Sequence, residues 1–187
     1  MGEAEKGALE ILVEQAKGGD RQAFSTVVRQ LMKQVTALTY RLTGDHDTAL
    51  DLAQETFVSA WENLPRFRGE SSFSSWVYRI AVNKSLNYKK SAAVVGAADA
   101  VDPDIVTAEQ AEPDIELERK ELAAAVQAFM IGLPDQQRII FNLRFYQQMS
   151  FEEIARTTGR ALGTVKTGYR EAVKKLRQHA REKGWQE

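Results

Sequence analysis

Apolar residues recur at intervals of three and four positions along most of the first ninety residues, which is the pattern of amphipathic helices. Residues that favour turns or break helices interrupt the pattern at Gly18, Gly44 and Pro65. Acidic or hydroxyl side chains that can cap a helix, such as Asp20 and Ser72, precede the next run. The predicted helices cover residues 9–17, 21–43, 47–64 and 73–90.

The pattern is lost over residues 91–118, where small residues, acids and two acid–proline pairs dominate. This segment has eight acidic residues and no cation. Self-repelling charge without an apolar face favours an extended chain. We therefore predict an acidic linker over residues 91–116, with the end of the segment joining the next helix.

Helical periodicity returns at about Leu117 and is broken by Pro134. Ser150 and Glu153 have the spacing of a capping box, which marks the start of a further helix. We find no strand-type alternation. The predicted fold is all-α, with one helical module over residues 1–90 and a second over residues 117–187.

Charge is distributed unevenly, although the net charge of the 187 residues is −1. Residues 1–90 carry +1, the linker segment 91–118 carries −8, and residues 119–187 carry +6. A basic module behind an acidic tether indicates a nucleic-acid partner. A solvated surface with a chance excess of cations is the simpler alternative.

The stretch "SFEEIARTTGRALGTVKTGYREAVKKL", residues 150–176, has the spacing of a helix-turn-helix. Ala155 is small enough for two helices to cross closely, Gly159 tolerates the positive φ of a sharp turn, and Val165 can anchor the second helix. Such a second helix enters the major groove, where its cations reach phosphates and base edges. An ordinary helical hairpin with a solvated cationic face is the alternative.

Several classes of site and location are not expected. The chain has no cysteine, which excludes disulfides and thiolate chemistry. His46 lies between two aspartates, and we interpret "GDHD" as the start of a helix rather than a metal site. No cofactor and no enzymatic activity are predicted. The charged start and the lack of an apolar run of about 20 residues favour a cytoplasmic protein.

Four motifs together resemble one protein family. They are "DLAQETF" at 51–57, "FSSWVYRIAVN" at 73–83, Leu133–Pro134, and the helix-turn-helix with "SFEEIA" and "GTVK". In order and spacing they are similar to the extracytoplasmic-function (ECF) sigma factors, the promoter-recognition subunits of bacterial RNA polymerase. The resemblance covers residues 9–90 and 117–183 and implies transcription initiation as the function. The linker is too short for the extra domain of larger sigma factors.

The resemblance implies that the polar face of the helix at 47–64 docks on the clamp helices of the largest subunit of core RNA polymerase. This face lies opposite the apolar face at helical spacing. Acids and amides there could pair with arginines of the partner. The predicted polymerase-binding residues are Asp51, Gln54, Glu55 and Val58.

The resemblance also implies that the loop after Pro65 and the helix at 73–90 hold the melted −10 element of the promoter, with one base flipped out. Amides read base edges and cations hold the backbone. Phe73, Trp76 and Tyr78 are better explained as core residues than as stacking platforms. The predicted −10 contacts are Arg66, Arg68, Ser74, Arg79, Asn83, Lys84, Asn87 and Lys90.

The resemblance also implies that the helix after Gly159 binds the −35 element of the promoter. Here the chain departs from the family pattern, because Gly168 stands where a side chain often touches DNA and Glu171 where a cation is usual. The affinity for the −35 element is therefore expected to be weak. The predicted −35 contacts are Arg160, Thr164, Lys166, Thr167, Arg170 and Lys174.

The resemblance further implies promoter DNA and an anti-sigma protein as partners. The acidic linker would thread toward the RNA exit path and mimic nucleic acid there, although a plain solvated linker fits as well. Two other functions stay open at this point. One is a one-component helix-turn-helix regulator, which would need a ligand pocket or a dimer face. The other is a polymerase-binding adaptor, which would not need the cationic helix.

Overall fold

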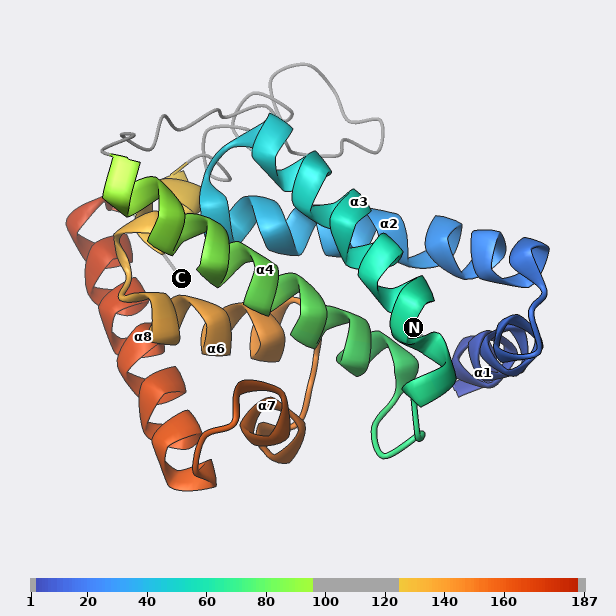
Figure 1. The fold of residues 1–187 in the computed structure, drawn as a ribbon. Coiled ribbons are helices and arrows are strands. Elements are labelled where there is room, and N and C mark those ends of the chain that lie inside the picture. Colours follow the sequence, from blue (N-terminus) through green and yellow to red (C-terminus); the bar gives the residue numbers. More distant parts are fainter. Residues whose placement is uncertain (1–2, 96–124, 185–187) are drawn as a thin grey trace, which may run out of the picture.

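The computed structural model describes residues 3–95 and 125–184, and every regular element in these two ranges is a helix (Figure 1). This confirms the predicted all-α fold. The elements are α1 (Glu3–Lys17), α2 (Arg21–Thr43), α3 (His46–Asn63), the short 3₁₀ helix η1 (Leu64–Arg66), α4 (Phe73–Val95), α6 (Asp135–Phe145), α7 (Phe151–Thr158) and α8 (Leu162–Glu182). Residues 125–132 are also helical.

Side-chain caps fix where several helices begin. Asp20 accepts hydrogen bonds from the backbone N–H groups of Gln22 and Ala23 and so caps α2. The cap of α3 is Asp45, which is two residues earlier than the predicted start, and this supports the reading of "GDHD" as a helix start. Both halves of the Ser150–Glu153 capping box are present at α7. The caps satisfy N–H groups that have no partner within their own helix.

The N-terminal module is built around α2, against which α1, α3 and α4 pack (Figure 1). Its core is the set of apolar positions that the periodicity predicted, including the fully buried Val27, Leu38 and Val77. Phe67, Phe73 and Trp76 form an aromatic cluster at the start of α4, with ring centroids 5.1–5.4 Å apart. Phe73 and Tyr78 are buried, so the prediction that these aromatics serve the core is confirmed.

The C-terminal module consists of α6, α7, α8 and the helical residues 125–132. Ile154 and Val165 are fully buried between the two helices of the helix-turn-helix. Gly159 has a φ of 66°, as the sharp turn requires. Tyr169 packs between Phe141 and Phe151, with ring centroids 5.9 and 5.5 Å away.

The two modules share one hydrophobic core, which the sequence did not predict. Buried residues of α6, α7 and α8, such as Ile139 and Ile154, belong to the same cluster as Leu42 and Val82 of the N-terminal module. Helix α7 packs against α4, and α6 packs against α2. The described part of the chain is therefore a closed arrangement of both modules.

The predicted linker lies mostly outside the described residues. Helix α4 continues to Val95, five residues into the segment predicted as linker, and residues 96–124 are not described. None of the helices in the described ranges is both long and apolar enough to cross a membrane.

Candidate nucleic-acid and partner-binding surfaces

The outer face of α3 presents all four residues predicted to bind polymerase. Asp51, Gln54, Glu55 and Val58 are exposed, whereas Leu52, Ala53, Thr56 and Phe57 are buried on the opposite side. Val58 is 58% exposed, which is high for an apolar residue. Polar groups around an exposed apolar centre are typical of a protein-binding surface.

The four residues line a shallow surface groove together with Ser59, Glu62 and Lys84. Lys84 of α4 forms an ion pair with Glu55, with Nζ 3.0 Å from Oε2. Lys84 was predicted to touch the −10 element, but the structure places it with the α3 face. Glu62 lies one turn beyond Val58, so helical spacing could have identified it.

Exposed polar side chains form a stripe along α4. Arg79, Asn83, Asn87 and Lys90 are all exposed and follow one another at intervals of three or four residues. Arg66 and Arg68, at the end of η1 and in the following loop, are exposed as well. These six residues are therefore free to meet a nucleic acid in the closed arrangement.

Ser74 differs from the other predicted −10 residues because it is buried. It is 9% exposed, and its hydroxyl oxygen has no hydrogen-bond partner. Ser74 lines a cavity of about 270 Å³ whose walls come from both modules, with Phe73 and Tyr78 on one side and Tyr146 and Met149 on the other. In this arrangement Ser74 cannot reach DNA.

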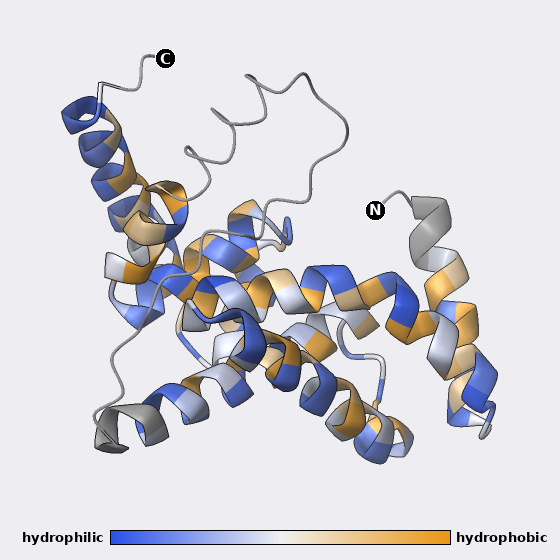
Figure 2. Cartoon of the chain, turned by 90° about the horizontal axis from the view of Figure 1, so that it is seen from above, coloured by the Kyte–Doolittle hydropathy of each residue, from blue (hydrophilic) through white to orange (hydrophobic). Residues whose placement is uncertain are grey.

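The outer face of α8 presents the residues predicted to bind the −35 element. Lys166, Thr167, Arg170 and Lys174 are exposed on α8, and Arg160 and Thr164 are exposed at the turn and in the first turn of the helix. Figure 2 shows α8, below the C-terminus, as predominantly hydrophilic. The buried Val165 and Ala172 turn the cationic face of α8 outward.

Gly168 has a packing role that the sequence did not reveal. A Cβ atom at this position would lie 2.8 Å from Cδ1 of Ile140, which is itself buried on α6. Gly168 thus lets α8 approach α6 closely. The interpretation of Gly168 as a missing DNA contact is incomplete for this reason. Glu171 is half-buried beside Gly168, along a groove that also includes Arg160 and Thr167.

Two family models match the chain, one to each module. Sigma-70 region 2 matches residues 27–94, and Sigma-70 region 4 matches residues 123–176. Together they cover more than half of the chain. The first match contains the α3 face and the α4 stripe, and the second contains the helix-turn-helix.

Curated relatives match over nearly their whole length. RNA polymerase sigma-H factor of Pseudomonas aeruginosa is 34% identical over 183 residues, which cover 89% of this chain and 92% of the relative. The ECF RNA polymerase sigma factor SigW of Bacillus subtilis is 30% identical over 178 residues, covering 91% and 95%. Each alignment thus covers most of this chain and nearly all of the relative.

The fold agrees with a solved structure of the same kind. The sigma factor RpoE of Bartonella quintana, crystallised with the anti-sigma factor NepR, superposes with a TM-score of 0.70 at 21% identity. The superposition covers 84% of this chain and 96% of RpoE. With both sigma-70 regions in order, an all-helical fold and near full-length relatives, the chain belongs to the ECF sigma factors of the sigma-70 family, which direct RNA polymerase to promoters.

Proposed function

We propose that the two modules divide promoter recognition between them, with residues 1–90 binding core polymerase and the −10 element and residues 117–187 binding the −35 element. The observation that carries this division is the placement of two chemically different surfaces on different helices. The α3 face combines acids, an amide and an exposed valine, whereas the α8 face is cationic. The first suits a protein partner and the second suits duplex DNA.

The α3 face is the proposed docking surface for the clamp helices of the largest polymerase subunit. Asp51, Gln54, Glu55 and Val58 would contact the partner directly. Lys84 holds Glu55 through their ion pair and thereby fixes the orientation of this carboxylate at the edge of the face. Exposed acids also steer association with a basic partner, so binding should weaken as ionic strength rises.

The α4 stripe is the proposed reader of the melted −10 strand. Asn83 and Asn87 lie one turn apart and carry amides that can both donate to and accept from base edges. Arg79 and Lys90 flank them and can hold the phosphates. Arg66 and Arg68 extend the cationic surface into the preceding loop.

The α8 face is the proposed reader of the −35 duplex. Lys166, Thr167, Arg170 and Lys174 follow the outer side of the helix, and Arg160 and Thr164 lie where a phosphate would pass its N-terminal end. Helix α8 has no acid in its first turn, so the positive end of its dipole remains available to a phosphate. With few cations in all, the isolated module should bind DNA weakly.

The remaining parts of the proposal concern location and partners. The chain itself would carry no catalytic step, since nucleotide addition belongs to the core enzyme that it directs. It would act in the cytoplasm, where that enzyme works. An anti-sigma factor is a further proposed partner, supported by the solved structure of RpoE with the anti-sigma factor NepR, whose fold this chain shares. Residues 91–116 would connect the modules.

Run-off transcription with purified core polymerase on a library of genomic promoters tests the proposal. We expect transcripts that begin at defined promoters only when the protein is present. Core binding without promoter-specific transcripts would instead indicate an adaptor. Tight operator binding without core polymerase would indicate a one-component regulator.

A further inference from the structure

The outward side of α8 carries two rows of residues that differ in chemistry. Residues three or four positions apart on a helix lie above one another on the same side. One row is wholly cationic and consists of Lys166, Arg170 and Lys174. The other row ends in an acid and consists of Thr164, Thr167 and Glu171. We refer to them as the cationic row and the mixed row.

The mixed row lines a surface groove between α8 and α6. Gln136, Gln137 and Ile140 of α6 line this groove as well, together with Arg160 from the turn before α8. The two helices come close here because Gly168 has no side chain, and a Cβ at this position would lie 2.8 Å from Cδ1 of Ile140. The groove therefore gathers hydroxyl, amide and carboxyl groups beside the cationic row.

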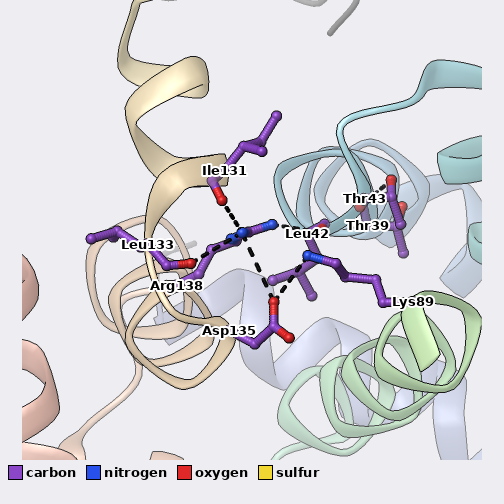
Figure 3. A network of polar contacts seen from close by, with 8 residues as sticks. All are labelled: Thr39, Leu42, Thr43, Lys89, Ile131, Leu133, Asp135 and Arg138. Carbon is purple, nitrogen blue, oxygen red and sulfur yellow. Dashed lines mark hydrogen bonds and ion pairs between the residues drawn. The ribbon is translucent and has the colours of Figure 1, made fainter. Parts of the chain in front are cut away.

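Helix α6 is held in place at the end that lines the groove (Figure 3). Arg138 is buried and donates hydrogen bonds to the backbone oxygens of Ile131 and Leu133. Its Nη2 also lies 3.9 Å from Oδ1 of Asp135, the first residue of α6. All of these contacts lie within the C-terminal module. They fix the first turn of α6, which carries the glutamines of the groove.

The side chain of Glu171 forms no hydrogen bond or ion pair with any residue in the described part of the chain. A lysine four residues after a glutamate is well placed to pair with it on a helix. Lys175 stands at that position, but its Nζ donates a hydrogen bond of 2.9 Å to Oε1 of Gln137 instead. The half-buried carboxylate of Glu171 is therefore free to accept hydrogen bonds in the groove.

A carboxylate on a helix in the major groove discriminates among base edges, because it can only accept hydrogen bonds. Phosphates repel it, and so do the edges of guanine and thymine, which present the acceptors N7, O6 and O4. Adenine places its N7 acceptor beside the N6 donor, whereas cytosine presents the N4 donor alone. Of the four bases, cytosine therefore matches a glutamate best.

We propose that Glu171 determines specificity at the −35 element by accepting a hydrogen bond from N4 of a cytosine. This inference rests on the proposed function, in which α8 lies in the major groove. The cationic row then holds phosphates or guanine edges, and the mixed row meets the cytosine. Glu171 lies five residues after Lys166, which is about 7.5 Å along α8. Its cytosine should lie about two base pairs from the pair that Lys166 contacts, at about 3.4 Å per pair.

Selection from a promoter library randomised over the −35 element tests this contact. Closed complexes of the protein and core polymerase are collected in the cold, and the bound duplexes are sequenced. We expect one position where cytosine is preferred about fivefold or more over every other base. Glu171→Ala should lose this preference, and Glu171→Gln should prefer adenine there, since glutamine pairs with N6 and N7 of adenine. The absence of such a position, or a cytosine preference that Glu171→Ala retains, would overturn the proposal.

Glu182→Ala is the matched control for the change in charge. Glu182 is exposed on α8, eleven residues after Glu171 and so about three turns further along the same side. Its removal should leave every base preference unchanged. If Glu171→Ala merely raised the affinity for all sequences alike, Glu171 would act as a general repulsion toward phosphates, and the proposal would fail.

Lys166→Ala in the same selection separates this inference from the proposed function. If Lys166→Ala changed a base preference and Glu171→Ala did not, Glu171 would read no base although α8 lay in the groove. If neither variant changed a preference, α8 would not read the −35 element, and the proposed function of this helix would fail as well.

A base analogue tests the atom that Glu171 is proposed to contact. 2-Pyrimidinone lacks the N4 amino group of cytosine but still pairs, more weakly, with guanine. In place of the selected cytosine it should weaken binding of the original complex about fivefold or more. Binding of the complex with Glu171→Ala should change much less, because that variant has no contact to lose. Equal weakening of both complexes would show that N4 does not contact Glu171 and would refute the proposal.

Discussion

The backbone of Gly168 on α8 lies directly against the side chain of Ile140 on α6, so that a Cβ at residue 168 would stand 2.8 Å from Ile140 Cδ1. Such a separation is too short for two carbons, and the buried Ile140 would have to move. Glycine at this position therefore sets how closely α8 packs against α6. Gly168→Arg, which would restore a side chain where the family often touches DNA, would meet the same obstacle at its Cβ before its guanidinium could reach DNA.

Gly168→Ala should lower the free energy of unfolding by about 1 kcal/mol. The helix would gain about 0.5–1 kcal/mol from alanine, but overpacking against a buried side chain costs about 1–3 kcal/mol. In an Ile140→Val background the obstructing Cδ1 is absent, and the same substitution should then stabilise the protein by roughly a few tenths of a kcal/mol. Urea unfolding of the four proteins measures both effects.

Gly163→Ala is the matched control on the same helix, because a Cβ at Gly163 has open space around it. Its effect should be small, and it should be equal in the original protein and in the Ile140→Val background. Equal effects of Gly168→Ala in the two backgrounds would show that Ile140 does not constrain residue 168.

Reversing two charges on the α3 face should abolish binding to core polymerase. Asp51→Lys with Glu55→Lys leaves the buried side of α3 untouched, so helicity measured by circular dichroism should not change. The second substitution also places a cation beside Lys84, the present partner of Glu55. Affinity for core polymerase, measured by fluorescence anisotropy, should fall at least tenfold.

Glu14→Lys with Asp47→Lys has the same effect on net charge at exposed positions outside the α3 face. It should keep most of the core affinity. Equal loss in the two double variants would assign the effect to overall charge, and no loss in either would remove α3 from the interface.

The cap of α3 should make stability depend on acidic pH. Hydrogen bonds from Thr48, through its side chain and its backbone N–H, hold the pKa of Asp45 below its usual value. A carboxyl whose pKa is lowered on folding contributes stability above the unfolded pKa of about 3.9, and this contribution is lost as pH falls toward the folded pKa. Asp45→Ala should cost about 1 kcal/mol at neutral pH and remove that part of the pH dependence.

Asp45→Asn separates the effect of the carboxylate charge on stability from the effect of capping the helix. Asparagine caps a helix well but does not titrate, so this variant should remain nearly as stable as the original at about pH 7 and vary less between about pH 5 and 3. Thermal unfolding across this range measures the difference. If stability depended on acidic pH in the same way in both variants as in the original protein, Asp45 would not contribute to that dependence.

Stability should also fall at high pH because of Tyr78. Burial raises the pKa of Tyr78 to about 12. An unfolded tyrosine loses its proton near about pH 10. As the pH rises, deprotonation therefore stabilises the unfolded state before it can stabilise the folded state. Between about pH 10 and 12 the free energy of unfolding should therefore decrease. Tyr78→Phe should show a shallower decrease, with Tyr88→Phe, at an exposed tyrosine, as the control.

Sequence periodicity was sufficient for the helices because each one has a buried apolar face of its own. Leu133–Pro134 ends one helix and allows α6 to begin at Asp135, and the Ser150–Glu153 box starts α7, as predicted. These are local effects between residues close in the chain. The α3 face and the cationic side of α8 could be predicted for the same reason, since exposure follows from the side of the helix that is not apolar.

Relationships between helices distant in sequence could not be predicted in this way. Arg138 reads as one more cation of a basic module, yet it is buried against Leu42, 96 residues earlier in the chain. Lys84 reads as a DNA contact, yet it pairs with Glu55. The local sequence suggests that Ser74 is a polar residue beside the loop, but residues of both modules enclose it. Each of these depends on packing that no local pattern encodes.

Substitutions on the two proposed DNA surfaces should produce separable defects. Asn83 is exposed on the α4 stripe and Lys166 is exposed on the α8 face. Each can therefore be replaced by alanine without disturbing the core. Lys166→Ala should weaken the closed complex with duplex promoter by about tenfold, since a lost base contact costs about 1–3 kcal/mol. Asn83→Ala should leave closed binding intact and slow promoter opening, measured by permanganate reactivity of the melted strand.

A template with a pre-melted bubble at the −10 element distinguishes the two roles. Opening is already complete on this template, so it should largely rescue Asn83→Ala, and only in part if Asn83 also holds the flipped base. It should not rescue Lys166→Ala, because the −35 duplex is the same on both templates. Gln178→Ala, on an exposed part of α8 outside the proposed contacts, should behave like the unmodified protein on each. If the bubble rescued both variants equally, α8 would not lie in the −35 groove. The defect of Lys166→Ala would then come from promoter melting rather than from binding to the duplex.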